Sequence, residues 1–548
     1  MSDAVDFFIS LFNKNLVNKQ EPGRYFRPRP YRNAVVRFRQ CSILDCDERR
    51  KILERRAGLN VFLFPADKIP GCDLLSDSGT TTMTAEQWAA MILGDEAYGS
   101  NEGYFELKEQ MAETFGSAWK QAGGQGSGGK ETLFIFHQGR AAENAFFSVL
   151  SRSLRDETVS CGNTLPDGLL PELRVRIESR MHSMAGVNGD ARNPCFIIPS
   201  NSHFDTTQGN IIDKNFVPLN MPCREHLEQR EDFPFRGDMD LAELENLLEH
   251  ASGRVPLVYL TVTNNTGGGQ PVSMENIRQI RRITAGYGVP FFFDACRFAE
   301  NAWFIRQKEK GYGSKSIEEI VREMFEHVDG FHISLKKDGL VNMGGAIMIR
   351  EESDFTSRYP HFNGWLTDYQ IMTEGHPTYG GLAGRDLKGI AQGLRTVVTK
   401  EYLDSRIGQV ERFGRKLSQY GIPIVKPIGG HAVYIDMDRF FEGAVRDEDF
   451  KANSFVALLM IAGHRMCELG LYAFGTFDGK GEIPPDPRVN YVRAAVPRLA
   501  YEDQDLSAAA EAVKLLSDNR DRIPGVHVEY GRELNLRHFK SRFSWKLE

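Results

Sequence analysis

Short apolar runs of strand length alternate with amphipathic stretches through the middle of the chain. The runs are Thr132–Phe136, Val255–Thr263, Val289–Phe293 and Phe331–Ser334. Segments of helical periodicity lie between them, such as the one that opens at Ser273 and then has an isoleucine at every third position from Ile277 to Ile283. Alternating strands and helices are typical of a parallel sheet whose faces are covered by helices. The pattern therefore predicts an α/β fold.

Two capping boxes indicate where helices begin. Thr84 is followed three residues later by Gln87, and Ser316 by Glu319. At this spacing each side chain accepts a hydrogen bond from the backbone N–H of the other residue. We expect one helix to begin directly after Thr84 and another directly after Ser316.

The pattern also divides the chain into domains. From about residue 400 the alternation gives way to long helical stretches, a hairpin-like segment over Ile422–Met437 and a β-rich tail. We predict an N-terminal arm over 1–24, then an N-terminal part of the small domain with an active-site segment over 25–80, which opens on an Arg-rich stretch (24–39). A large domain over 81–395 and a smaller C-terminal α+β domain over 396–548 follow. Two stretches, near 120–130 and 152–193, break the pattern and are expected to be surface insertions.

The composition excludes several classes of protein. In a chain of 548 residues, 41% are hydrophobic and 26% charged, which provides ample material for buried cores. No apolar run approaches the roughly 18 residues of a membrane span, and a net charge of −7 argues against general nucleic-acid binding. The eight cysteines are scattered singly, too sparsely for a disulfide scaffold, and the first residues do not resemble a signal peptide. We expect a cytoplasmic protein that binds neither membrane nor nucleic acid.

One stretch imitates a nucleotide-binding motif. Residues 124–130 fit the P-loop pattern G-x-x-x-x-G-K, but Glu131 stands where magnesium binding needs a serine or threonine. The glycine-rich turn after Val255–Thr263 lacks the G-x-G-x-x-G fingerprint of dinucleotide binding. We therefore interpret 124–130 as a linker and expect no nicotinamide cofactor.

Polar residues follow three of the predicted strands. Gln138-Gly139-Arg140 lies between a strand and a helix start, Asp294 directly follows Val289–Phe293, and Lys336-Lys337-Asp338 follows Phe331–Ser334. Ligands of open parallel sheets bind at this edge, and a helix start favours phosphate. A phosphate cradle, a carboxylate for a pyridine nitrogen and a lysine for a Schiff base are what pyridoxal 5′-phosphate (PLP) requires. The sequence predicts a PLP site.

Longer strings resemble one family, the β-eliminating lyases, which include tryptophanase and tyrosine phenol-lyase. They are collinear from about residue 30 to the C-terminus and include H-Q-G-R-A-A-E-N (137–144), F-D-T-T-Q-G (204–209), T-V-T-N-N-T-G-G-G-Q-P-V-S-M (261–274), F-D-A-C-R-F-A-E-N-A (293–302), S-L-K-K-D-G-L-V-N-M-G-G (334–345) and Y-V-R-A-A-V-P-R (491–498). The resemblance implies a PLP-dependent carbon–carbon lyase. It also implies PLP fold type I (aspartate aminotransferase-like), with a large domain on a mostly parallel sheet and a smaller α+β domain.

The resemblance also implies roles around the cofactor. Lys337 resembles the Schiff-base lysine and the base for the substrate Cα proton, whereas its neighbour Lys336 should point to the opposite face. The other expected cofactor contacts are Asp294 at the pyridine nitrogen, Arg297 and Asn265 near the ring oxygen, Phe204 stacked on the ring, and Gln138, Gly139, Arg140 and Ser334 at the phosphate. This chain departs from the family at Ser76, at Cys296 in place of a threonine, and at Leu335.

Further roles concern the substrate, a cation and the assembly. Arg493, helped by Ser78 and Asn265, is similar to the arginine that binds the amino-acid carboxylate, a task that suits its bidentate fork. The family's monovalent-cation site takes potassium at a subunit interface, and its ligands correspond to Glu96, the carbonyl of Gly79, and Asn342. The resemblance further implies a homotetramer, built as a dimer of dimers.

Three positions distinguish the activities within the family. Leu469 replaces the arginine of phenol-lyases, and Asp205 and His538 stand where tryptophanases have the same residues. We expect β-elimination of L-tryptophan to indole, pyruvate and ammonia, with Tyr98, Asp205 and His538 as candidates for protonating the leaving group. The alternatives are a tyrosine phenol-lyase, a β-eliminating lyase of cysteine-like amino acids, and a catalytically silent cofactor-binding protein.

Overall fold

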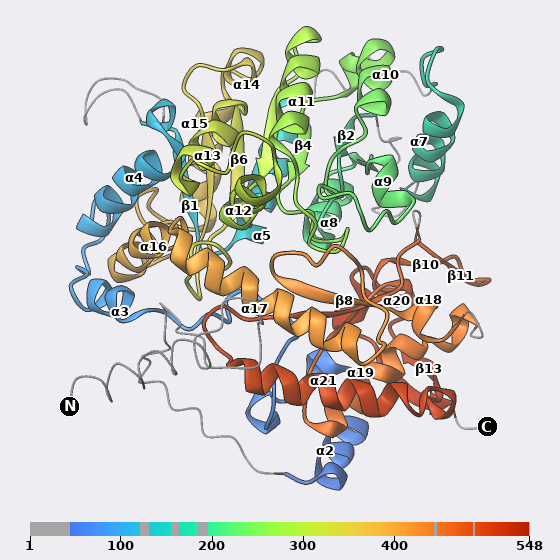
Figure 1. The fold of residues 1–548 in the computed structure, drawn as a ribbon. Coiled ribbons are helices and arrows are strands. Elements are labelled where there is room, and N and C mark those ends of the chain that lie inside the picture. The colour runs from blue at the N-terminus through green and yellow to red at the C-terminus, as the bar shows by residue number, and fades with distance from the viewer. Residues whose placement is uncertain are drawn as a thin grey trace, which may run out of the picture.

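The computed structural model describes residues 44–120, 131–154, 164–184, 195–442, 446–485 and 488–546. The predicted arm (1–24), the Arg-rich segment (24–39), the linker with the P-loop-like motif (124–130) and part of the stretch 152–193 lie outside these residues. The described part consists of two domains, shown in Figure 1. The large sheet and its helices lie above, the smaller domain lies below, and α17 (Lys400–Gln419) runs across the boundary.

The large domain is built on a mostly parallel sheet. Five strands pair in the order β1 (Leu133–Phe136), β7 (Gly345–Ile349), β6 (Gly330–Ser334), β5 (Phe291–Asp294) and β4 (Val258–Thr261). β4, β5 and β6 are parallel, and β7 is antiparallel to both of its neighbours. The parallel pair β2 (Ile197–Ser200) and β3 (Val217–Asn220) lies beside β4. Here the side chain of Asn201, directly after β2, donates to the carbonyl of Thr261 and accepts its backbone N–H. The strands are buried on both faces, as parallel sheets require.

Helices cover both faces of this sheet. The helices of the large domain are α3 (Ala85–Ile92), α4 (Glu102–Phe115), α5 (Gly139–Ser153), α7 (Pro171–Met184), α8 (Asp205–Asp213), α9 (Arg224–Leu227), α10 (Leu241–Ala251), α11 (Met274–Gly286), α12 (Phe298–Lys308), α13 (Ile317–Glu326), α14 (Asp354–Arg358), α15 (Phe362–Thr373) and α16 (Gly384–Val397). β1 shows how the core splits: Leu133 and Ile135 join the core with α4, α11, α13 and α16, whereas Phe134 and Phe136 join the core with α5 and α15. Alternate side chains thus enter opposite layers.

The smaller domain has a core of its own. Its antiparallel sheet has the order β8 (Ala432–Asp436), β12 (Tyr491–Ala495) and β9 (Cys467–Leu469). The other elements are α2 (Cys46–Ile52), α18 (Met437–Phe440), α19 (Lys451–Ala462), α20 (Leu471–Phe474), α21 (Asp503–Ser517), β10 (Thr476–Phe477), β11 (Glu482–Ile483), β13 (Gly525–Tyr530) and β14 (Arg542–Lys546). One hydrophobic cluster joins residues between Leu53 and Leu74 to residues between Val410 and Phe543. This shared core supports our proposed division, in which the segment before residue 80 packs with the C-terminal domain.

Several local predictions are confirmed. α3 follows the capping box of Thr84 and Gln87, and α13 follows that of Ser316 and Glu319. The stretch Ile422–Met437 is hairpin-like, since Ile424 forms an antiparallel bridge with Ile435.

The expectation of a surface insertion over 152–193 was wrong for part of that stretch. Residues 171–184 form α7, and its side chains Leu173, Ile177 and Met184 are buried in the large core. Three apolar residues on one helix face are enough for packing, although the segment is otherwise polar.

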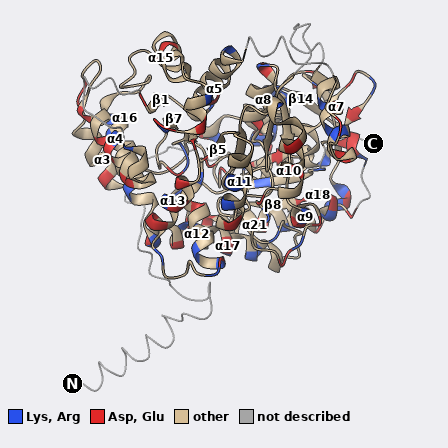
Figure 2. Ribbon diagram, turned by 90° about the horizontal axis from the view of Figure 1, so that it is seen from above, with Lys and Arg blue, Asp and Glu red and all other residues tan. Residues whose placement is uncertain are grey.

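The surface and the cysteines complete the description. Acidic and basic residues are interspersed along the outer helices (Figure 2). Five cysteines of the described residues are free thiols, namely Cys46, Cys72, Cys223, Cys296 and Cys467, whereas Cys195 is disulfide-bonded. Within the described ranges, no helix is both long and apolar enough to cross a bilayer.

Candidate active site

The site lies where the carboxyl ends of parallel strands meet. Thr261 at the end of β4 stands beside Asp294 at the end of β5, and Asp294 stands beside His332 near the end of β6. The chain segments that follow these strands carry Asn265, Arg297 and Lys337. A parallel sheet brings such segments to one edge, where ligands bind.

Lys337 and Lys336 point to different surroundings. Lys337 is 9% exposed, and its Nζ lies 3.8 Å from Cys296 Sγ and 5.7 Å from the ring centroid of Phe204. Lys336 lies against Gly79 instead, because a Cβ added to Gly79 would be 2.5 Å from Lys336 Cε. Lys337 is therefore the lysine beside Phe204, the residue expected to stack on the cofactor ring.

Asp294 lies in a buried polar cluster at the end of β5. Its Oδ1 accepts the backbone N–H of Cys296 at 3.3 Å and lies 3.5 Å from His332 Nε2. The same His332 nitrogen is 3.2 Å from Oε1 of Glu143, a buried residue of α5. No motif singled out His332 in the sequence. The one available signal was a histidine within an apolar strand.

Asp294, Cys296 and His332 are close enough together to share a metal ion, with ligand atoms within 4.8 Å of one another. However, burial raises the pKa of the Cys296 thiol, and the nearby carboxylate of Asp294 raises it further. Without a metal ion the Cys296 thiol therefore keeps its proton, and it lies among hydrogen-bonding partners such as the backbone N–H of Ser334.

The start of α5 forms a cradle next to β6. Gln138 is the N-cap residue of this helix but makes no side-chain capping bond. A Cβ on Gly139 would lie 2.4 Å from the Cβ of Ser334, so only glycine allows this approach. Arg140 is exposed beside them. Free N–H groups at a helix start, with a serine across from them, fit a phosphate group.

Arg493 of the smaller domain is in contact with Asn265 of the large domain. Arg493 Nη1 donates to Asn265 Oδ1 at 3.4 Å, and Nη2 donates to the carbonyl of Leu75 at 3.2 Å. Among the residues that the structure describes, Arg493 Nε and Asn265 Nδ2 are buried and have no hydrogen-bond partner. Unpaired buried donors are costly unless a ligand satisfies them. This arrangement fits a carboxylate or another oxyanion.

The surroundings of Asn265 include two residues to which sequence reasoning gave no role. Asn265 Oδ1 lies 2.7 Å from His431 Nε2 and accepts the hydroxyl of Tyr434 at 3.0 Å. Ser78, expected to help bind the substrate, donates its backbone N–H to Ser76 Oγ at 3.1 Å.

An apolar wall lies on the sheet of the smaller domain. Leu469 pairs with Tyr491, and Cys467 pairs with Arg493, across β9 and β12. Residues two apart in a strand share a face, so Leu469 lies on the same face as Arg493. Leu469 is packed there with Ala432, Tyr434, Cys467, Tyr491 and Ala495.

Asp205 and His538 meet although they are far apart in the chain. Asp205 opens α8 and His538 lies in the short helix Arg537–Phe539, and Asp205 Oδ2 is 3.6 Å from His538 Nε2. Burial tends to raise the pKa of Asp205, but His538 and Arg493 lower it below its ordinary value. The influence of Arg493 on this pKa indicates that its guanidinium lies near the Asp205 carboxylate.

Arg297 is held by a carboxylate that the sequence did not single out. Its guanidinium makes two hydrogen bonds to Asp77, which also accepts one from Arg498 Nη1 at 2.9 Å. Arg498 in turn bonds Glu300 and Asp338, each at 2.8 Å. Within the described residues, this network joins the N-terminal segment, the large domain and the smaller domain.

The expected cation ligands fall into two groups. Asn342 Nδ2 donates to the carbonyl of Gly79 at 2.9 Å, so these two residues lie together. Glu96 is exposed and paired with Arg385 at 2.8 Å. Tyr98 is 81% exposed and packs edge-on against His376 and Tyr379. Within this single chain, therefore, Glu96 and Tyr98 lie on an open surface.

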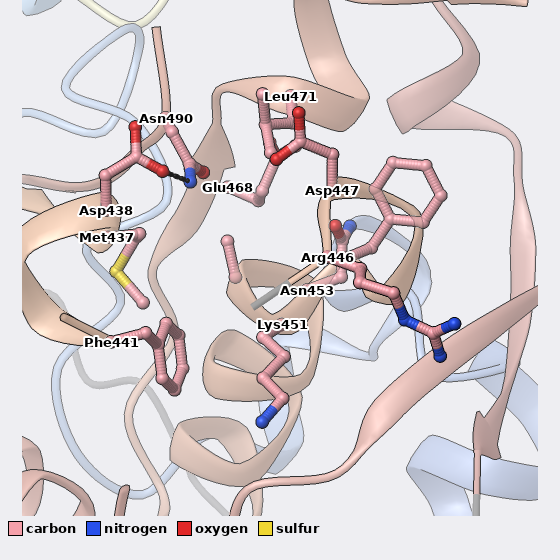
Figure 3. A pocket seen from close by; sticks show the side chains of 12 residues that line it. Met437, Asp438, Phe441, Arg446, Asp447, Lys451, Asn453, Glu468, Leu471 and Asn490 are labelled. Atoms are coloured by element: carbon pink, nitrogen blue, oxygen red, sulfur yellow. Dashed lines mark hydrogen bonds between the residues drawn. The ribbon is translucent and has the colours of Figure 1, made fainter. Parts of the chain in front are cut away.

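A separate pocket lies in the smaller domain (Figure 3). It is lined by Met437, Asp438, Phe441, Arg446, Asp447, Phe450, Lys451, Ala452, Asn453, Glu468, Leu471 and Asn490. Its volume is about 30 Å³, enough for one or two water molecules but not for an amino acid. It contains none of the predicted site residues.

Comparisons with known proteins identify the family of this chain. The model of the beta-eliminating lyase family matches residues 73–512. A "Probable beta-eliminating lyase" of Trichomonas vaginalis is 36% identical over 494 residues, covering 90% of this chain and 93% of that protein. A "Tryptophanase" of Salinibacter ruber is 38% identical, covering 90% of each chain. A "Tyrosine phenol-lyase" of Intrasporangium calvum is 33% identical, covering 94% of each.

The family match spans most of the chain, and the relatives align with it almost from end to end. The strand-end lysine, the carboxylate and the cradle, with the unpaired donors beside them, fit PLP and an amino-acid substrate. The chain therefore belongs to the β-eliminating lyases, and it is a PLP-dependent lyase of fold type I.

Proposed function

We propose that this enzyme releases indole from L-tryptophan and leaves pyruvate and ammonia. The observation that carries this proposal is the buried pair of Asp205 and His538, 3.6 Å apart. Indole leaves readily only after its C3 carbon is protonated, which requires a positioned acid. The apolar side chain of Leu469 suits the benzo ring, whereas an arginine there would suit a phenol oxygen.

Each step then falls to a group of this chain. Bound PLP supplies the electron sink that stabilises a carbanion at the substrate Cα. Arg493 and Asn265, through their unpaired donors, would hold the substrate carboxylate. Lys337, next to Phe204, would then remove the Cα proton, and His538 with Asp205 would supply a proton at indole C3.

The remaining cofactor contacts are proposed on the same grounds. Asp294 would accept a hydrogen bond from the protonated ring nitrogen of PLP, and Phe204 would stack on the ring. Gln138, Gly139, Arg140 and Ser334 would hold the phosphate. The bidentate pair with Asp77 fixes Arg297, which would approach the ring oxygen from that position.

We also propose a homotetramer with a potassium site at a subunit interface. The exposure of Glu96 and Tyr98 supports this, because both side chains are open to contact with another subunit. Gly79 and Asn342 would supply the remaining ligands. On this proposal Tyr98 of one subunit would assist proton transfer in its partner. A cytoplasmic location stays a prediction from the sequence.

A substrate panel tests the proposed specificity. The holoenzyme is given L-tryptophan, L-tyrosine and S-methyl-L-cysteine, and the release of indole, phenol or thiol is followed together with pyruvate. We expect kcat/KM for tryptophan to exceed that for tyrosine by at least about 100-fold, since discrimination by a built polar site reaches this range. Faster turnover of tyrosine would favour a phenol-lyase, and turnover of S-methyl-L-cysteine alone would favour a thiol-releasing lyase.

A further inference from the structure

His332 lies between two buried carboxylates behind the strand-end site. Its Nε2 is 3.2 Å from Glu143 Oε1 and 3.5 Å from Asp294 Oδ1. His332 is fully buried, and Glu143 and Asp294 are 4% and 3% exposed. Neither contact has the geometry of a hydrogen bond among the described residues, but both distances are within ion-pair range.

The other groups around His332 are Tyr259, Cys296 and Lys337. His332 Nδ1 lies 3.0 Å from the hydroxyl of Tyr259 on β4. This hydroxyl oxygen can accept a hydrogen bond from a protonated Nδ1. Cys296 lies beside Asp294. Lys337 lowers the pKa of His332, whereas the two acids raise it. The imidazole of His332 thus lies within 3.5 Å of both acids.

Glu143 is fixed on its far side. Its Oε2 accepts the hydroxyl of Thr206 at 2.9 Å, and its Oε1 accepts that of Thr207 at 3.0 Å, both from α8. The α8 helix also begins at Phe204 and Asp205. Contacts thus run from α8 through Glu143 and His332 to Asp294.

We propose that His332 is a positioning residue for the cofactor: as an imidazolium it ties Asp294 to Glu143 and holds Asp294 ionised to receive the ring N–H of PLP. With His332 charged, the three residues carry one net negative charge, and the ring N–H cation of PLP neutralises it. This inference rests on the proposed contact between Asp294 and the ring nitrogen. Burial by itself would lower the pKa of His332, but Asp294 and Glu143 raise it above its ordinary value.

The test compares two cofactors in two variants. The affinities of the full-length protein, His332→Asn and Glu143→Gln are measured for PLP and for 1-deazapyridoxal 5′-phosphate, which lacks the ring nitrogen. We expect His332→Asn to bind PLP about tenfold more weakly, the loss typical of one charge-assisted contact, and to bind the deaza analogue as well as the unchanged protein does. Glu143→Gln should weaken PLP binding in the same direction, and the double variant should lose little more than His332→Asn.

Two controls make the outcomes decisive. His464→Asn alters a buried histidine of the smaller domain that accepts the Cys72 N–H at 3.0 Å, and it should leave both affinities unchanged. If His332→Asn fails to fold, Glu143→Gln carries the same comparison. Equal losses for both cofactors, or no loss for PLP, would overturn the inference. Asp294→Asn separates the two proposals. A loss of affinity for PLP but not for the deaza analogue supports the Asp294 contact, whereas equal losses for both cofactors, or none for PLP, would reject that contact itself.

Discussion

Arg297 grips the carboxylate of Asp77 through two parallel hydrogen bonds, from Nε to Oδ2 at 3.0 Å and from Nη2 to Oδ1 at 2.8 Å. The side chains are 4% and 1% exposed. Arg498 of the smaller domain binds the same carboxylate. One acid therefore links three parts of the chain that meet at the active site.

The first prediction concerns the stability of this network. Asp77→Asn leaves two buried guanidinium groups without their shared countercharge, so it should lower the free energy of unfolding by about 3–5 kcal/mol. Urea unfolding of the purified protein measures this. Asp232→Asn, which breaks the exposed pair with Arg230, is the control and should have no measurable effect. A similar small effect of both variants would contradict the structural role given to Asp77.

The second prediction separates the two adjacent lysines. Lys337→Ala should abolish the visible absorbance of the holoenzyme and its activity, because the nitrogen beside Phe204 is lost. Lys336→Ala removes a side chain that lies against Gly79 and should keep the absorbance band. Borohydride reduction followed by peptide mapping checks the assignment. A reduced adduct on Lys336, or on no residue, would refute it.

The third prediction concerns Arg493. Arg493→Lys keeps the charge but loses the fork that reaches both Asn265 and a bound carboxylate. We expect kcat/KM for the amino-acid substrate to fall by about tenfold or more, mainly through KM, with little change in PLP affinity. Steady-state kinetics and a cofactor titration test this. A drop in PLP affinity as large as the change in KM would place Arg493 at the cofactor rather than at the substrate.

The fourth prediction concerns the leaving group. His538→Phe removes the partner of Asp205 but keeps an aromatic ring beside Phe539. Turnover of tryptophan should fall by about 10²–10⁴-fold, the usual contribution of a general acid. S-methyl-L-cysteine and other substrates that need no such acid should be affected far less. Equal losses on both kinds of substrate would show that His538 has a structural role only.

The fifth prediction concerns pH. Burial raises the pKa of Asp238 from 3.8 to about 8, although two hydrogen bonds from Ser273 act against this shift. The folded state then keeps a proton that the unfolded state releases, so this residue lowers stability as pH rises from about 4 to about 8. Asp238→Asn keeps an acceptor for the Ser273 N–H and cannot ionise. Its stability should fall less over this range, as urea unfolding at several pH values would show. Parallel curves for both proteins would contradict the shift.

Much of the site could be predicted because its residues follow strands. The apolar runs before Asp294 and before Lys337 each predict a strand. A parallel sheet places the carboxyl ends of these two strands side by side. Local signals were equally dependable at Thr84 and Ser316, where the capping box involves neighbours three residues apart. Both kinds of signal depend on short-range geometry.

Other features could not be predicted from the chain order. Asp77 lies 220 positions before Arg297, and Glu143 lies far before His332, so no local pattern pairs them. The helix α7 was taken for a surface stretch because its three buried side chains are few among polar neighbours. In these cases packing between distant segments decides burial, and burial decides which charges need partners.

The sequence by itself determined the alternating fold, the PLP chemistry and the family, because strand-end residue types and collinear motifs are written locally. Only the tertiary structure decided which acid holds Arg297 and that His332 stands between two carboxylates. The reason is physical. An ion pair or a buried hydrogen bond depends on distance in space and on exclusion of water, and only the packed chain sets both.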